Sequence, residues 1–163
     1  MRNQQSTIPQ EKKVPSLSDT FHKRLDSLFI TSSIIFNIGV SGVYLASKFH
    51  DEVLLDIFGA LVVLLILPFS VSLIGYIKEK AKKKIIVSHS IILLYLIIEV
   101  SLDYILKIPF RDIIYVHIPY IIVFYAAAFS MIGVSFDVDK KMGFWVLITF
   151  LILIGCLIYM YIG

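Results

Sequence analysis

Long uncharged stretches, separated by short polar and charged segments, dominate the sequence. A membrane-spanning helix needs about 20 apolar residues to cross about 30 Å of hydrocarbon. Four uncharged runs reach that length: residues 27–47, 57–77, 113–136 and 142–163. A fifth stretch, residues 85–106, is equally long but contains Glu99 and Asp103. The pattern therefore predicts five transmembrane helices.

The predicted fold class is all-α, a polytopic membrane protein built as a bundle of five transmembrane helices. With their ends, the predicted spans cover residues 27–48, 53–77, 85–107, 112–136 and 142–163. Residues 27–163 are expected to form a single transmembrane domain. Residues 1–26 are expected to form a polar cytoplasmic tail, with an interfacial turn over residues 21–25 that leads into the first span.

The composition agrees with this interpretation. The chain has 163 residues, of which 58% are apolar and 17% are charged, and its mean hydropathy is +0.88. Soluble domains are about 25% charged. A chain of this length has too little interior to bury so much apolar surface in water. The single cysteine excludes a disulfide framework and a cysteine-only metal cluster.

Lysine and arginine are distributed unevenly over the predicted loops. Most of the 15 basic residues fall on one side, in residues 1–26, 78–84 and 140–141. Basic residues mark the cytoplasmic side, so the N-terminus is predicted to be cytoplasmic and the C-terminus extracytoplasmic. The lysine-rich segment Lys78–Lys84 is also expected to attract anionic lipid headgroups.

The expected partner is the lipid bilayer, in a cytoplasmic or similar membrane, and no nucleic acid is expected. Because five short spans make a narrow scaffold, a homo-oligomer or a larger membrane complex is a plausible assembly. The sequence identifies neither a cofactor nor a metal.

Two features predict how the helices pack. Ser33, Asn37 and Ser41 are four residues apart, so they share one face of the first span, where small and polar residues favour helix–helix contact. Pro68 lies inside the second span and removes one backbone hydrogen bond, which predicts a kink there.

Ionisable and aromatic residues gather at one predicted depth. Glu99, Asp103 and Lys107 are spaced i, i+4, i+8 and are expected to line one face of the third span. A rise of about 1.5 Å per residue places residues from three spans in the outer third of the membrane. The candidate ligand- or proton-binding residues are Glu99, Asp103, Asp56, His117, Lys107, Arg111, Tyr104 and Tyr120.

The leading hypothesis is an outward-facing polar pocket that binds or passes a small cation, a proton or a polar solute. Ionisable groups inside a span usually face protein or a watery cavity. Glu99 would be the deep proton or cation acceptor, Asp103 and Asp56 would form the mouth, and His117 would be a tunable partner.

Two alternatives remain open. In the first, the protein is an accessory subunit of a larger complex, and Glu99 and Asp103 belong to a structural ion-pair network with Lys107, Arg111 or His117. In the second, acidic residues and histidine at one depth hold a metal in a membrane-embedded enzyme. The sequence has no HExxH, GxSxG or P-loop motif to support that enzyme.

The segment 108–118, between Pro109 and Pro119, has two possible structures. It either begins the fourth span as a helix or forms an interfacial or re-entrant piece, with the fourth span starting at Pro119.

Overall fold

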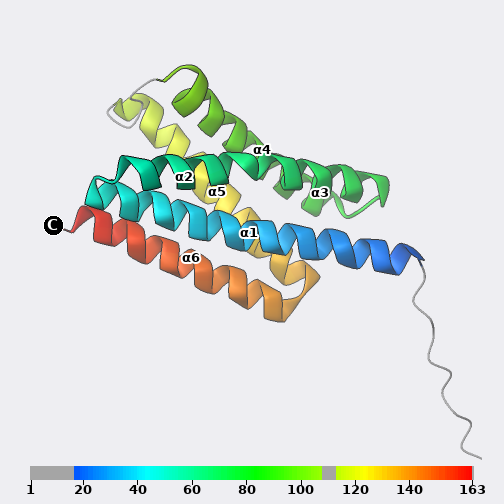
Figure 1. Cartoon of the computed structure of the whole chain (residues 1–163). Helices are drawn as coiled ribbons and strands as arrows, with labels where there is room; N and C mark the ends of the chain where they lie inside the picture. The colour runs from blue at the N-terminus through cyan, green and yellow to red at the C-terminus, as the bar shows by residue number, and fades with distance from the viewer. Residues whose placement is uncertain (1–16, 108–112, 163) are drawn as a thin grey trace, which may run out of the picture.

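The computed structural model describes residues 17–107 and 113–162, and it describes no strand in those ranges (Figure 1). The elements, in chain order, are the helices α1 (Leu17–Phe49), α2 (Glu52–Leu64), α3 (Ile66–Lys78) and α4 (Lys83–Glu99), the π-helix η1 (Val100–Ile105), and the helices α5 (Ile114–Val138) and α6 (Lys140–Tyr161). The all-α prediction is confirmed.

The described residues contain five helical stretches long and apolar enough to cross a membrane. They are Phe21–Phe49, Glu52–Lys78, Lys83–Ile105, Ile114–Val138 and Lys140–Tyr161. Their number and order match the predicted spans, so the five-helix bundle is confirmed. Helix α1 begins ahead of the first predicted span, and residues 21–25, for which we predicted an interfacial turn, belong to this continuous helix.

The two prolines of the second and fourth spans have different effects. The second span is interrupted at Leu65, between α2 and α3. Pro68 has no N–H to donate to the carbonyl of Leu64. The interruption is one residue long, because the backbone of Leu65 stays right-handed helical (φ −67°, ψ −11°). Pro119, by contrast, lies inside α5. The alternative in which the fourth span starts at Pro119 is therefore wrong, while residues 108–112 lie outside the described residues.

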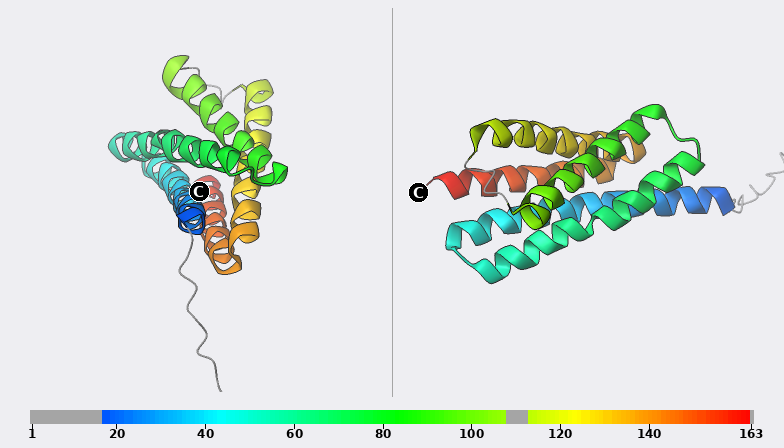
Figure 2. Two further views of the ribbon diagram at one scale, coloured as in Figure 1. Left: turned by 90° about the vertical axis from the view of Figure 1, so that its right-hand side faces the viewer. Right: turned by 90° about the horizontal axis from the view of Figure 1, so that it is seen from above.

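Helix α1 organises the bundle. It contacts α2 and α3 along one side and α6 along the other, while α5 links α6 to α4 (Figure 2). Phe29 and Phe36 of α1 have no exposed surface, and both pack against rings from neighbouring helices. The core therefore runs along α1 from one end of the bundle to the other.

The polar face of α1 is buried as its spacing predicts. Ser33, Asn37 and Ser41 are at most 6% exposed. The Asn37 amide Nδ2 donates to the carbonyl of Val146 over 3.2 Å and lies 3.0 Å from Thr149 Oγ1, and both partners are on α6. The two serine hydroxyls instead donate to carbonyls of α1, four residues earlier. Of the three, Asn37 is the residue that links two helices.

Asn37→Ala is therefore expected to lower the free energy of unfolding by about 1 kcal/mol, because interhelical hydrogen bonds in membranes contribute about 0.6 kcal/mol on average and up to about 1.7. Ser41→Ala is the matched control on the same face, with an expected loss below about 0.5 kcal/mol because only a bond within α1 is removed. Unfolding in detergent measures both variants. Equal losses would contradict the assignment of the α1–α6 link to Asn37.

Candidate functional site

A cavity of about 520 Å³ lies at the end of the bundle where α1 and α6 end and α2 and α5 begin. Side chains from α1, α2, α4, η1, α5 and α6 all line it. The third span ends and the fourth span begins at this same end of the bundle. The acidic part of the third span therefore reaches the cavity. The site therefore lies between helices, a common position for small-molecule sites in bundles.

Most of the residues predicted from depth come together here. Those that line the cavity are Glu99, Asp103, Asp56, His117, Tyr104 and Tyr120. Lys107 does not line it and is exposed, and Arg111 lies outside the described residues. None of the described residues that line the cavity is a lysine or an arginine.

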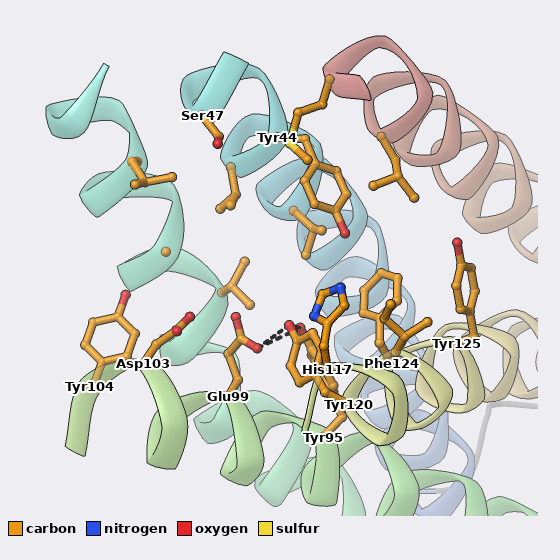
Figure 3. A pocket seen from close by; sticks show the side chains of 18 of the residues that line it. Tyr44, Ser47, Tyr95, Glu99, Asp103, Tyr104, His117, Tyr120, Phe124 and Tyr125 are labelled. Atoms are coloured by element: carbon orange, nitrogen blue, oxygen red, sulfur yellow. Dashed lines mark hydrogen bonds between the residues drawn. The ribbon is translucent and has the colours of Figure 1, made fainter. Parts of the chain in front are cut away.

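Glu99 is held in position by two tyrosines (Figure 3). The hydroxyl of Tyr120, on α5, donates to Glu99 Oε2 over 2.5 Å. The hydroxyl of Tyr95, one turn before Glu99 on α4, lies 3.2 Å from the same oxygen and 3.0 Å from the Tyr120 hydroxyl. The single Tyr95 proton can therefore go to either acceptor. This group ties α4 to α5 and orients the carboxyl group of Glu99 at the cavity.

Asp103 and Tyr104 stand on a π-helix, which the spacing did not predict. In η1 the backbone N–H of Leu106 donates to the carbonyl of Ser101, five residues earlier, over 2.9 Å. The helix then ends, and Lys107 has a positive φ of 50°. The expected single face of Glu99, Asp103 and Lys107 is therefore wrong, because π-turns and the helix end rotate Lys107 away from the other two. Such π segments occur frequently at functional sites.

Tyr104 closes the gap between η1 and α2. A Cβ added to Gly59 of α2 would lie 2.7 Å from the Tyr104 hydroxyl, so this hydroxyl rests directly over the glycine. Tyr104 lines the same cavity as Asp103, Glu99 and Asp56. Asp56, one turn before Gly59, is exposed at this end of α2.

His117 lies on the α5 side of the cavity. Its ring stacks with Tyr120 at a centroid distance of 6.3 Å and an interplanar angle of 18°. Its Nδ1 is buried and has no hydrogen-bond partner among the described residues. A polar atom in this position can accept or donate one hydrogen bond to a ligand or a water molecule, depending on its tautomer.

An aromatic part of the wall was missing from the predicted site. It consists of Tyr44 on α1, Tyr95 on α4, Phe124 and Tyr125 on α5, and Tyr161 on α6. Depth is the signal that could have found some of them, because Tyr44 is close to the end of α1 and Tyr161 is the last residue of α6. Depth alone does not show which tyrosines turn inward.

The metal hypothesis finds no candidate site in the described part of the chain. There, no group of three or more His, Cys, Asp or Glu side chains could hold a metal ion. At the opposite end of the bundle, Lys84 forms an ion pair with Asp137 over 2.7 Å, and His22 Nδ1 lies 3.6 Å from Glu79 Oε2. At the cavity end, Lys48 is turned toward α6, where its Nζ donates to the carbonyl of Ile162.

Comparisons with protein-family models, with curated proteins and with solved structures found no match to this chain. The class of protein is therefore described from its fold and its cavity. It is a small polytopic α-helical protein whose five spans are long and apolar enough for a membrane, with an acidic and aromatic cavity at one end.

Proposed function

We propose that the protein binds a small cationic solute in this cavity and passes it across the membrane, in the manner of a transporter or channel. The observation that carries the proposal is the set of carboxyl groups, Asp56, Glu99 and Asp103, which line one cavity from three different elements. Inside a low-dielectric bundle, carboxylates attract cations more strongly than in water and repel anions.

The distribution of charge supports a cavity that faces outward. The lysine-rich segments 78–84 and 140–141 lie at the opposite end of the bundle, which the positive-inside rule predicts to be cytoplasmic. Those lysines also support contact with anionic lipid headgroups. A solute would then meet Asp56 at the exposed start of α2 before it reaches Glu99.

Packed rings at the inner side of the cavity support this one-sided arrangement. Phe36 lies one turn below Val40 on α1 and has no exposed surface. Its ring centroid is 5.7 Å from that of Tyr95 and 6.3 Å from that of Phe124. Passage of a solute therefore requires these rings to separate, as expected for a state that is open on one side.

Charge movement in proteoliposomes tests the proposal. Wild type, Glu99→Gln and Glu79→Gln are reconstituted and challenged with Na⁺, K⁺, ammonium and guanidinium, and with chloride as the anion control. We expect currents driven by at least one cation in wild type and in Glu79→Gln, whose carboxyl group lies at the other end of the bundle. Glu99→Gln should reduce them at least tenfold. Equal currents in all three proteins, or an anion current alone, would overturn the proposed function.

A further inference from the structure

The cavity is much larger than a bare ion. Its volume of about 520 Å³ would hold about 17 water-sized groups at about 30 Å³ each. Small-molecule sites occupy about 300–1,000 Å³, and a cavity in that range suits a ligand with on the order of ten non-hydrogen atoms. A bare monovalent ion would leave most of this space to water and would contact few of the lining residues.

The walls of the cavity differ in chemistry from one side to the other (Figure 3). Glu99, Asp103 and Tyr104 lie together on the α4–η1 side, whereas the rings of Phe124 and Tyr125 lie on the α5 side, beyond His117 and Tyr120. Aliphatic side chains, among them Val40, Ile121 and Leu157, also line the cavity. A ligand that matches both sides has one charged, hydrogen-bonding end and one apolar body.

The polar side matches a primary ammonium group. Such a group has three N–H donors and no acceptor. On the acidic side, the carboxyl groups of Glu99, Asp103 and Asp56 line the cavity. Tyrosine rings around the cavity add the attraction of a cation for an aromatic face, which is strongest where water is excluded. An anionic end would meet repulsion from the same carboxyl groups.

We infer that the ligand of this cavity is a primary organic ammonium ion with an apolar body, such as an arylalkylamine. The inference rests on the proposed function, since it names the class of cation that the same cavity takes. Glu99 and Asp103 bind the ammonium group, and Phe124 and Tyr125 contact the apolar body.

Calorimetry on the full chain in a neutral maltoside detergent tests the inference with three probes. Phenethylammonium has both the ammonium group and the apolar body. Ammonium chloride supplies only the charge, and 2-phenylethanol has the apolar body with a neutral hydroxyl end. We expect phenethylammonium to bind at least tenfold more tightly than either of the other two. Glu99→Gln should weaken phenethylammonium binding at least tenfold, while Glu79→Gln should leave it unchanged.

Two further variants separate the parts of the site. Tyr125→Leu removes a ring from the apolar side and should weaken phenethylammonium binding several-fold without affecting ammonium. Asp56→Asn, at an exposed position on α2, should weaken phenethylammonium binding several-fold without threatening the fold. Competition by a short-chain phosphatidylethanolamine shows whether the ammonium group belongs to a lipid headgroup or to a free amine.

The possible failures are distinguishable. If Na⁺, K⁺ or ammonium binds in a Glu99-dependent way and phenethylammonium does not, this inference is wrong and the proposed cation function stands. If 2-phenylethanol binds as tightly as phenethylammonium, the cavity does not recognise the charge and the inference is wrong. If no cation binds in a Glu99-dependent way, both the inference and the proposed function are overturned.

Discussion

Phe36→Ala is expected to lower the free energy of unfolding by about 3 kcal/mol, since truncation of a buried phenylalanine typically costs about 3–5 kcal/mol. The ring has no exposed surface and packs edge-on against Tyr95 beneath the cavity. Lipid is as apolar as the protein core, so little transfer free energy is lost in a membrane. The lost dispersion contacts and the new void therefore dominate, which favours the lower end of the range.

Phe49→Ala is the matched control, because Phe49 is on the same helix and is 67% exposed. Its expected loss is below about 1 kcal/mol, since few protein contacts are removed. Thermal or denaturant unfolding in the same detergent compares the two variants. Phe36→Ala should also weaken cation binding, because Tyr95 loses the ring that supports it beside Glu99. Equal destabilisation by the two substitutions would show that the ring layer under the cavity does not stabilise the bundle.

Gly143→Ala is expected to lower the free energy of unfolding by about 1–3 kcal/mol, the usual cost of overpacking a well-packed contact. A Cβ at this buried position of α6 would lie 2.6 Å and 2.7 Å from ring carbons of Phe136 on α5, and 2.9 Å from its Cα. The ring could swing away, but the Cα is backbone, so α5 and α6 would have to separate next to the turn at Asp139.

Gly155→Ala is a control on the same helix, and its expected effect on stability has the opposite sign. A Cβ added there would meet no described side chain and no neighbouring helix within 4 Å, its adjacent residues aside. The substitution should leave stability unchanged or raise it by up to about 1 kcal/mol, because alanine favours a helix more than glycine does. A comparison of the melting temperatures of the two variants tests this difference in stability. A tolerated Gly143→Ala would mean that the α5–α6 contact is looser than the structure describes.

The number of spans could be predicted because it follows from a comparison between the length of each apolar run and the thickness of a bilayer. The shared depth of Glu99, Asp56 and His117 could be predicted for a similar reason, because helical rise is nearly constant. The direction in which each side chain points around the helix axis could not be predicted in this way. The spacing of Asp103 and Lys107 assumed regular α-helix, and no glycine or proline in residues 100–106 signals the π-turns that replace it.

The aromatic walls were harder to predict, for a packing reason. Even on α5, where Tyr120 was a candidate residue and donates to Glu99, Tyr115 lies five residues earlier and is 88% exposed. Which of two tyrosines at similar depth faces inward depends on the neighbouring helices. A single sequence gives the order of apolar residues along each span but contains little information about which spans become neighbours.

The π-helix η1 has a further consequence for local stability. The structure describes no buried residue within Val100–Ile105, whereas the preceding part of α4 has Ile92, Tyr95 and Leu96 fully packed. The free energy of local opening follows the number of buried contacts, so a sparsely packed terminus opens more readily than a core helix. Asp103 and Tyr104 thus stand on the more easily displaced wall, and Tyr95 on the rigid one. For the proposed solute, entry would then involve the fraying of one short segment, while the five-helix frame keeps its packing.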